Sequence, residues 1–258
     1  MSEADLRLGF VYSMSRRNEA LRLLAEGHTL SQASRLTGIS RAAIRDWAAH
    51  PGSARGGSSC PRCDLVDLDA EAYSALLGFY LGDGCISRAP RYFALRVSCD
   101  LKYPRIIDDV AECIGAVHRT GTIHRVSAEG CLVIQSHWQH WPCVLPQHGP
   151  GRKHERRIVL HGWQRDIVTA HPAAFLRGLF HSDGCRANNW TSKVIAGELK
   201  RYDYPRWQFT NVSTDNQELC CWALDLVEVP WRQSNRKTIS VSTRAGVARL
   251  DELIGLKQ

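Results

Sequence analysis

Apolar residues recur at spacings of three and four between residues 13 and 49, which is the period of helices that pack by one face. Glycines and small hydroxyl residues interrupt this pattern at Gly27, Thr29, Ser31, Gly38 and Ser40. Because glycine ends helices and serine or threonine caps their starts, the pattern predicts three short helices. The last two, joined by a tight turn at Gly38, predict a helix-turn-helix within residues 1–50.

The third of these helices is expected to present Arg41 and Arg45 to the outside. A recognition helix carries the side chains that contact bases and phosphates in this way. The basic character of the helix favours double-stranded DNA as the ligand of this domain. The alternative is a three-helix unit that binds another protein.

A Pro/Gly/Ser-rich stretch comes next, and residues 51–69 are expected to form a linker that contains Cys60 and Cys63. Two cysteines separated by two residues can bind one Zn²⁺ as thiolates. Two further ligands would have to come from elsewhere. Two pairs are candidates, His140 with Cys143 and His148 with His154. The alternative is a pair of reduced thiols that binds no metal.

The remainder of the chain contains two copies of one pattern. LLGFYLGDG at 76–84 aligns without gaps with LRGLFHSDG at 176–184, so that the two aspartates lie 100 residues apart. Each copy is a helical segment followed by extended segments, a second helical segment and further extended segments. A repeat of this length is too long for a solenoid and predicts two pseudo-symmetric half-domains, residues 70–165 and residues 166–258.

Small residues are spaced four apart in both copies, as Gly78 and Gly82 in the first and Gly178 and Ser182 in the second. Residues i and i+4 share one face of a helix. Glycine inside a helix costs about 1 kcal/mol relative to alanine. We therefore expect the two helices to approach each other closely along these small residues.

Each motif ends in Asp-Gly, and Gly84 and Gly184 are expected to cap the helices in the left-handed conformation. Close packing of the two helices would bring Asp83 and Asp183 side by side. Neighbouring carboxylates repel each other unless divalent cations such as Mg²⁺ lie between them. Paired metal sites cleave phosphodiesters by activating water and stabilising the leaving oxygen.

The two motifs resemble the signature helices of single-chain LAGLIDADG homing endonucleases, over about residues 70–255. The resemblance implies an α+β fold, in which two αββαββα half-domains form a saddle over the DNA major groove, here preceded by a small all-α helix-turn-helix. It also implies that Asp83 and Asp183, with Gly82 and Ser182 at the metal site, bind Mg²⁺ or Mn²⁺. A double-strand break at a specific site, as in intron or intein homing, is the implied reaction.

Other parts of the implied site are less defined. Family members use basic or polar side chains to polarise the attacking water or the scissile phosphate, and the candidates here are Lys102, Lys153 and Lys237. The first acidic position of the motif is Leu81 in one copy and His181 in the other, a departure that the family tolerates. The predicted nuclease activity therefore rests on the two aspartates.

DNA contacts are expected from the exposed faces of the strands and from a flexible, basic connector at residues 145–165. Arginine and glutamine can bond the edges of guanine and adenine, and a positive connector can follow the phosphate backbone. The candidates are Arg91, Arg96, Arg152, Arg156, Arg206 and Gln208. The alternative for each is an ordinary solvated side chain. The net charge of +7, from 33 basic and 26 acidic residues, agrees with a polyanionic partner.

The composition, 44% apolar and 23% charged, is that of an ordinary soluble globular protein. No apolar run is long enough to span a membrane, and the first residues lack the pattern of a secretory signal. We therefore expect a cytoplasmic protein that associates with the nucleoid when bound to DNA, and reduced cysteines. The internal duplication predicts a monomer with a pseudo-two-fold axis.

Two other functions are compatible with the sequence. A transcriptional regulator that keeps the fold and binds DNA without cleaving it would also combine a helix-turn-helix with this domain, although both aspartates are present here. An RNA-splicing maturase of the same fold is disfavoured because the helix-turn-helix indicates duplex DNA. Cleavage of DNA distinguishes the nuclease from the regulator.

Overall fold

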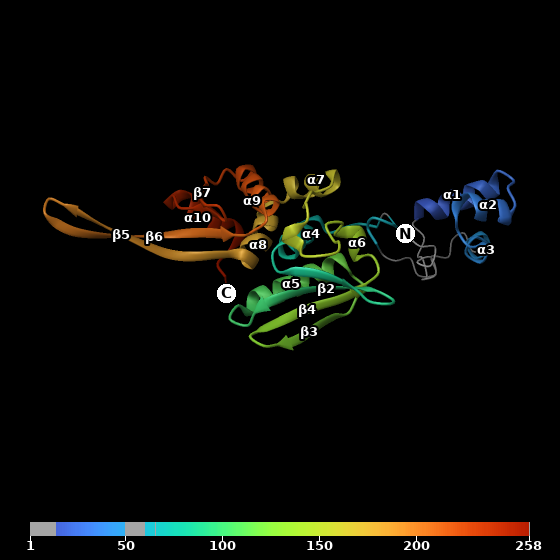
Figure 1. The fold of residues 1–258 in the computed structure, drawn as a ribbon, viewed down its shortest axis with the longest axis horizontal. Helices are drawn as coiled ribbons and strands as arrows, with labels where there is room; N and C mark the ends of the chain where they lie inside the picture. The colour runs from blue at the N-terminus through green and yellow to red at the C-terminus, as the bar shows by residue number, and fades with distance from the viewer. Residues whose placement is uncertain (1–13, 50–59, 65, 258) are drawn as a thin grey trace. The chain divides into compact units, whose positions relative to one another are not determined.

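The computed structural model in Figure 1 divides the chain into two compact units, residues 1–66 and residues 67–258. It describes residues 14–49, 60–64 and 66–257. Most of the predicted linker thus lies outside the described residues. Among the described residues, no helix has both the length and the apolar character that a membrane crossing needs.

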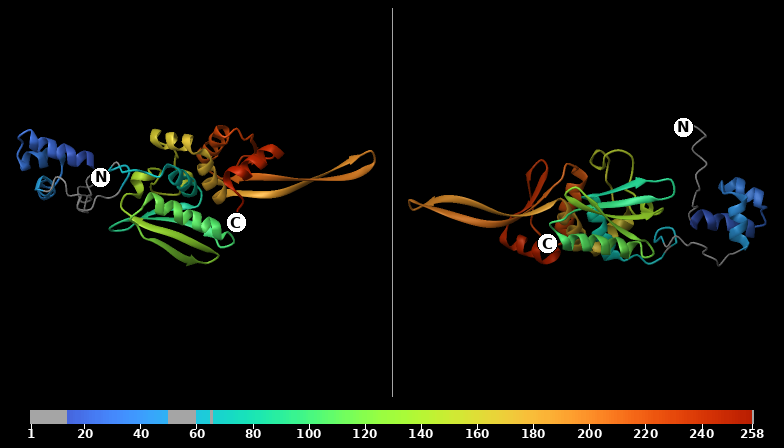
Figure 2. Two further views of the ribbon diagram at one scale, coloured as in Figure 1. Left: turned by 180° about the vertical axis from the view of Figure 1, so that it is seen from behind. Right: turned by 90° about the horizontal axis from the view of Figure 1, so that it is seen from below.

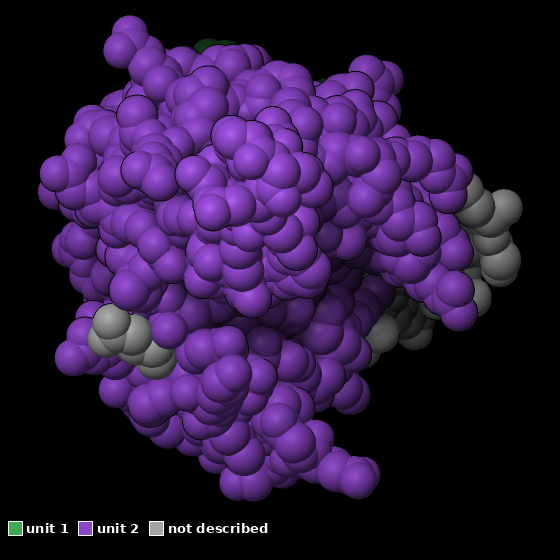
Figure 3. Space-filling view, turned by 90° about the vertical axis from the view of Figure 1, so that its left-hand side faces the viewer, with its two compact units in different colours: residues 1–66 green, residues 67–258 purple. Residues whose placement is uncertain are grey.

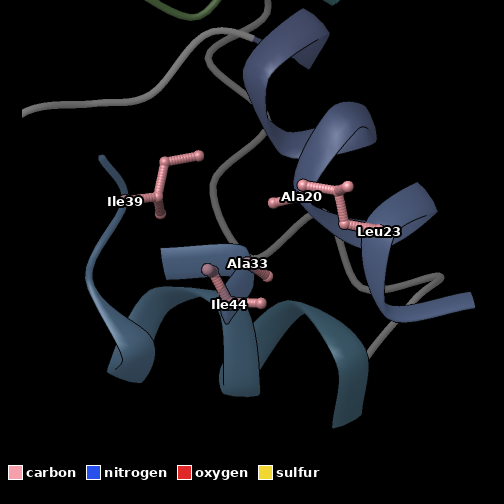
Figure 4. Packing of buried hydrophobic residues seen from close by; sticks show 5 residues of the cluster. All are labelled: Ala20, Leu23, Ala33, Ile39 and Ile44. Atoms are coloured by element: carbon pink, nitrogen blue, oxygen red, sulfur yellow. The ribbon is translucent and has the colours of Figure 1, made fainter. Parts of the chain in front are cut away.

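The described residues of the N-terminal unit form three helices: α1 (Met14–Ala25), α2 (Leu30–Thr37) and α3 (Arg41–Ala49). Their apolar faces meet in one core, shown in Figure 4. This core buries Ala20, Leu23, Ala33, Ile39 and Ile44. The helices form because apolar residues at helical spacing gain more from burial together than each helix could gain alone.

The turns of this unit depend on three residues with capping roles. The Thr29 side chain accepts a hydrogen bond from Gln32 N at 3.2 Å and so caps α2. Gly38 ends α2 in the left-handed conformation, with φ 67°. Ser40 Oγ accepts a hydrogen bond from Ala43 N at 3.3 Å at the start of α3. A short turn therefore joins α2 and α3.

The second unit begins with a copy of the predicted helix–strands–helix–strands pattern. Its elements are α4 (Ala70–Leu81), β1 (Gly84–Arg88), β2 (Phe93–Asp100), α5 (Pro104–Val117), β3 (Ile123–Ala128), β4 (Cys131–Trp138) and α6 (Trp141–Val144). The four strands form one antiparallel sheet in the order β1-β2-β4-β3. Helix α5 packs on this sheet against β2, β3 and β4.

The second copy has the same topology. After η2 (Lys153–Glu155) and α7 (Gly162–Ala170) come α8 (Pro172–Asp183), β5 (Gly184–Ile195), β6 (Glu198–Thr210), α9 (Thr214–Leu226), β7 (Arg232–Asn235), β8 (Thr238–Val241) and α10 (Arg244–Ile254). The antiparallel sheet order is β5-β6-β8-β7, the equivalent of the first sheet. The predicted α+β duplication is confirmed.

The two copies differ in the length of their first hairpin. Strands β1 and β2 have 5 and 8 residues, whereas β5 and β6 have 12 and 13. Figures 1 and 2 show β5 and β6 projecting as a long two-stranded arm. The second sheet therefore reaches much farther from the helices than the first.

Helices α4 and α8 lie side by side in the second unit. A Cβ added to Gly78 would lie 2.9 Å from Gly178 Cα, and one added to Gly178 would lie 2.7 Å from Phe79 N. Real Cβ atoms essentially never come that close. Only glycine permits the two backbones to approach in this way, which explains its presence inside both helices.

The connector at residues 145–165 is packed rather than flexible. Leu145, Ile158 and Leu160 are buried, and Ile158 N donates a hydrogen bond to the Asp215 carboxylate. Burial of these apolar residues fixes the segment on the second unit despite its basic charges. The prediction of a flexible connector was therefore wrong.

Candidate active site

Asp83 and Asp183 lie where α4 and α8 end, next to the small residues Gly82 and Ser182. A Cβ added to Gly82 would lie 2.7 Å from Ser182 Oγ and 3.4 Å from Asp183 Oδ2. The charge of Asp183 also raises the pKa of Asp83. The close approach of the helices thus brings the two carboxylates into one site.

The glycines that follow the aspartates act differently from the prediction. Gly184 is extended, with φ −91° and ψ 155°, and Gly84 also lacks a positive φ. A Cβ on Gly84 would lie 2.5 Å from Tyr80 Cα, and one on Gly184 would lie 2.7 Å from Phe180 Cα. The prediction of left-handed caps was wrong: each glycine is needed because a strand folds back against the helix before it.

The carboxyl group of Asp83 has an unusually high proton affinity. Asp83 keeps an exposed edge, but burial of its carboxyl group raises its pKa from 3.8 to about 6, and the charge of Asp183 adds to this increase. Lys153 and Lys257 act in the opposite direction. A cation bound at this site would favour the ionised carboxylate.

Asp183 is held by a hydrogen bond that the sequence did not predict. Asn211, directly after β6, donates from Nδ2 to Asp183 Oδ2 at 2.7 Å. Burial raises the pKa of Asp183, whereas this hydrogen bond lowers it. Asn211 therefore both orients the carboxylate and favours its charged form.

Lys153 caps the end of α4. Its Nζ donates to three carbonyl oxygens, those of Tyr80 at 2.5 Å, Gly82 at 2.7 Å and Gly84 at 2.8 Å. Burial lowers the pKa of Lys153 to about 8, although both aspartates raise it. The helix C-terminus concentrates partial negative charge, which explains why an ammonium group is stable there. Lys153 thus places a positive charge beside the acidic pair.

Lys257 places a second positive charge beside the acidic pair, at the end of α8. The sequence alone did not single out this residue. Its Nζ donates to Ser182 O at 3.1 Å. Burial lowers the pKa of Lys257, while Asp83 and Asp183 raise it. Lys257 follows the last helix of the second copy, as Lys153 follows the last helix of the first. Lys153 and Lys257 are 104 residues apart, close to the separation of the two aspartates, and this spacing could have revealed Lys257.

The other two candidate lysines are exposed in turns that border the site. Lys237 O accepts a hydrogen bond from Asn211 N at 3.0 Å, and the Tyr103 ring beside Lys102 lines the pocket at Asp83. Lys102 is exposed in the turn after β2, with its Nζ 5.4 Å from the centre of the Tyr103 ring. Lys237 is exposed in the turn between β7 and β8. In the described structure neither side chain forms a hydrogen bond or ion pair with Asp83 or Asp183.

The donor atoms around the acidic pair are those that a hard divalent cation prefers. Asp83 and Asp183 offer carboxylate oxygens, while the carbonyl oxygens of Gly82 and Ser182 already accept hydrogen bonds from Lys153 and Lys257 and have one lone pair left. Ser182 Oγ is buried and has no hydrogen-bond partner within the described part of the chain. This all-oxygen donor set fits Mg²⁺ or Mn²⁺ and gives no thiolate to the ion.

A pocket opens beside Asp83. Its lining includes Asp100, His181, Ser182 and Lys257. Burial lowers the pKa of His181 to about 4, so this side chain is neutral at pH 7. The side chain at the first acidic position of the second motif is therefore uncharged, and Asp183 alone supplies the negative charge of that motif.

The first sheet has one polar face. Arg96 and Gln135 are paired across β2 and β4, and Arg96 Nε donates to Gln135 Oε1 at 2.8 Å. Arg96 also donates to Ser87 Oγ at 2.9 Å. His124 and His137 flank Gln135, with ring centroids 5.0 Å apart. Side chains that can donate and accept hydrogen bonds thus lie together on this face.

The second sheet has the equivalent face. Trp207 and Phe209 point into the core, so Arg206 and Gln208, which alternate with them, lie on the opposite side of β6. Arg206 Cζ lies 5.6 Å from the centre of the Tyr204 ring on the same side. Figure 3 views the second unit from the end at which the β5–β6 arm projects, and its surface is hollowed near the middle of that view.

The remaining candidate arginines have different surroundings. Arg91 is exposed in the turn before β2, and Arg152 is exposed in the connector. Arg156 is half-buried and donates to Gly149 O. In the N-terminal unit, Arg41 and Arg45 are exposed on α3, four residues apart and hence on one face.

The cysteine pair of the predicted zinc site forms a turn. Cys63 N and Asp64 N both donate to Cys60 O, at 3.2 and 2.8 Å. The Asp64 carboxylate accepts a hydrogen bond from Cys60 N at 3.1 Å. Cys60 is buried and Cys63 is half-buried. The turn thus holds the two cysteines at a fixed spacing.

Comparisons with known proteins gave matches only among solved structures. No family model matches the sequence, and no curated protein matches it. The chain is similar to the homing endonuclease I-DmoI in complex with DNA and Mn, with 11% identity and a TM-score of 0.48, over 73% of this chain and 98% of that chain.

Two further matches have comparable scores. The N-terminal LAGLIDADG domain of DUF199/WhiA is 13% identical with a TM-score of 0.45, over 73% of this chain and 83% of that chain. The LAGLIDADG meganuclease I-AabMI bound to uncleaved DNA is 12% identical with a TM-score of 0.45, over 70% and 82%. These matches are to the family that the two motifs resemble.

Proposed function

We propose that the protein is a site-specific endonuclease that cleaves double-stranded DNA with Mg²⁺ or Mn²⁺. The observation that carries this proposal is the pair Asp83 and Asp183 at the meeting point of two helices, with Lys153 and Lys257 beside it. Carboxylates suit a divalent cation and ammonium groups suit a phosphate, and phosphodiester cleavage needs both in one place. The polar faces of the two sheets flank this point and supply a surface for a duplex.

In the proposed reaction the cation and the side chains of the protein have different roles. When bound by the two carboxylates, the cation supplies an activated water and stabilises the leaving oxygen. Asp83 and Asp183 orient that centre, and Asn211 fixes the position of Asp183. Lys153 and Lys257 neutralise negative charge that develops on the phosphate.

In this proposal the polar faces of the two sheets and the N-terminal unit contact the DNA. Arg96 on β2 and Arg206 on β6 lie on the same face of equivalent strands, so one chain can contact the two halves of a site as a monomer. Gln208 adds a side chain that can bond adenine edges. Arg41 and Arg45 of α3 add a second set of contacts. The target would be genomic DNA in the cytoplasm.

A cleavage assay tests the activity. Plasmids carrying segments of the protein's own genomic context are incubated with Mg²⁺ and wild-type protein, Asp83→Asn, Asp183→Asn or Asp108→Asn. The Asp108→Asn variant is the matched control, because Asp108 forms an exposed ion pair with Arg125 away from the site. Cutting by the wild type and the control, with loss in both site variants, is the expected result.

The second candidate is a regulator that binds DNA without cleaving it. Its support is the N-terminal unit, where Arg41 and Arg45 are exposed on a helix that follows a short turn. Tight binding to a specific sequence, without cutting in Mg²⁺, Mn²⁺ or Ca²⁺, would reject the nuclease and favour the regulator.

We also propose that Cys60 and Cys63 bind Zn²⁺. A CxxC turn presents two thiolates at the spacing that zinc sites use. Cys63 N and Asp64 N donate to Cys60 O, and Cys60 N donates to the Asp64 carboxylate, so the turn that carries the thiols is already formed. Zinc analysis of the purified wild type and of Cys60→Ser tests this proposal, with zinc expected only in the wild type.

A further inference from the structure

A zinc site at Cys60 and Cys63 would be incomplete with these two ligands. Structural zinc sites have four protein ligands in tetrahedral geometry, drawn from cysteine and histidine. The inference that follows rests on the proposed zinc binding at the CxxC turn and concerns the residues that complete it.

The second unit contains a pair with the same spacing, His140 and Cys143. His140 Nδ1 lies 3.6 Å from Cys143 Sγ. With a Zn–S bond of about 2.3 Å and a Zn–N bond of about 2.0–2.1 Å, tetrahedral geometry separates the two ligand atoms by about 3.6 Å. The pair is therefore spaced as two ligands of one zinc ion.

The backbone of this pair repeats the turn of the CxxC motif. Cys143 N and Val144 N both donate to His140 O, at 2.9 and 3.3 Å. The corresponding N–H groups of Cys63 and Asp64 donate to Cys60 O. In each pair the first residue is buried and the second is half-buried. The two pairs thus present their side chains from equivalent turns.

The other candidate pair lacks these features. The His148 ring lies edge-on against Phe93, with centroids 5.5 Å apart. His154 Nε2 lies 3.8 Å from a carboxylate oxygen of Glu155. No contact between the two rings appears in the described structure, and each has a different neighbour. His148 and His154 therefore do not form a chelating pair.

We propose that His140 and Cys143 complete a tetrahedral Zn²⁺ site with Cys60 and Cys63. Three thiolates and one imidazole are a donor set typical of structural zinc sites. A site with four protein ligands leaves no position for water or substrate, so the role of this ion is structural. It is separate in chemistry from the oxygen-ligand site at Asp83 and Asp183.

Metal analysis and Co²⁺ substitution of the full-length protein test the four-ligand site. The wild type is expected to hold one zinc per chain, and its Co²⁺ form to show thiolate-to-metal charge transfer and the visible bands of tetrahedral Co²⁺. Cys143→Ser is expected to lose zinc and to weaken the charge-transfer band. Cys131→Ser is the matched control, since Cys131 is a half-buried cysteine at the start of β4.

His140→Cys keeps the test decisive if Cys143→Ser fails to fold. Four thiolates also bind zinc tetrahedrally, so this variant is expected to retain one zinc and to strengthen the charge-transfer band of Co²⁺. One outcome would overturn this inference but not zinc binding at the CxxC turn. In that outcome Cys60→Ser loses zinc, whereas Cys143→Ser and His140→Cys keep zinc and show an unchanged Co²⁺ spectrum. Absence of zinc from reconstituted wild type would reject both this inference and zinc binding at the CxxC turn.

Discussion

Asn211 donates a hydrogen bond to Asp183 at 2.7 Å, and the matching position beside Asp83 is Cys99. The strand register sets this correspondence. In each copy the last glycine of the repeated motif pairs with a residue on the next strand, and Cys99 or Asn211 lies two residues after that strand partner. Burial, together with the charge of Asp83, raises the pKa of Cys99 to about 12, so it is a neutral thiol and a weak donor. The two aspartates are therefore held differently.

Replacing Asn211 should shift the pH dependence of cleavage. The hydrogen bond lowers the pKa of Asp183, so Asn211→Ala should raise that pKa and move the acid limb of the pH–rate profile to higher pH. Asn188→Ala, an exposed asparagine on β5, is the control and should leave the profile unchanged. Superimposable profiles for the wild type and Asn211→Ala would show that the hydrogen bond has no such role.

Without divalent ions, stability should depend on the charge of Asp83. Because its folded pKa of about 6 is above the ordinary 3.8, the folded state binds the proton more tightly than the unfolded state. The Asp83 carboxyl group therefore adds to the free energy of unfolding at about pH 4, and this contribution is lost as the pH rises through about 6. In EDTA at about pH 7.5, Asp83→Asn should melt no lower than the wild type, and Mg²⁺ should raise the Tm of the wild type only. A lower Tm for the variant in EDTA would contradict this account.

Lys257 should contribute to cleavage more than to binding. Lys257→Met removes the positive charge at the end of α8 and should slow cleavage about 100-fold, the typical effect of losing one group that stabilises developing charge. Binding measured in Ca²⁺ should change little. Lys200→Met, which removes an exposed charge near the tip of the β5–β6 hairpin, is the matched control. Equal rates for the two variants would exclude Lys257 from the site.

The helix contact makes Gly178 irreplaceable. In Gly178→Ala the new Cβ would collide with Ala75 O and lie 2.7 Å from Phe79 N, so we expect a loss of about 3 kcal/mol or more in the free energy of unfolding. Gly162→Ala is the matched control, because nothing lies within 4 Å of its Cβ position. It should be neutral or stabilising by up to about 1 kcal/mol. Urea unfolding measures both, and equal stabilities would refute the close contact.

The N-terminal unit should add salt-dependent affinity for DNA. Each arginine that contacts a phosphate contributes a slope of about −0.9 to the plot of log K against log salt concentration. Arg41→Ala with Arg45→Ala should therefore reduce the magnitude of the slope by up to about 2. Arg22→Ala, which removes a partner of Glu26 on α1, is the control. A slope unaffected by the double substitution would favour protein binding by this unit.

Sequence patterns predicted the elements well because their causes are local. The spacing of apolar residues and the caps at Thr29, Gly38 and Ser40 depend on neighbours within one or two turns. The duplication was equally visible, since two copies of one motif lie in register. Gly78 and Gly178 were informative because glycine inside a helix needs a packing reason.

Charge patterns gave less reliable predictions. The connector was expected to be flexible because of its basic residues, whereas the buried Ile158 and Leu160 decide its structure. Lys153 was one of three lysines that sequence alone could not distinguish, and only the structure shows that its Nζ bonds the end of α4 while Lys102 and Lys237 are exposed in turns. The position of a side chain in a site depends on packing between segments far apart in the chain.

By itself, the sequence determined the repeat, the helices and the two acidic positions, because each is encoded within a short stretch. Only the tertiary structure decided which other groups meet those acids. Lys257 reaches Ser182 across 75 residues, and Asn211 reaches Asp183 across 28. Such contacts form when whole elements pack and the chain between them closes, so no local pattern specifies them.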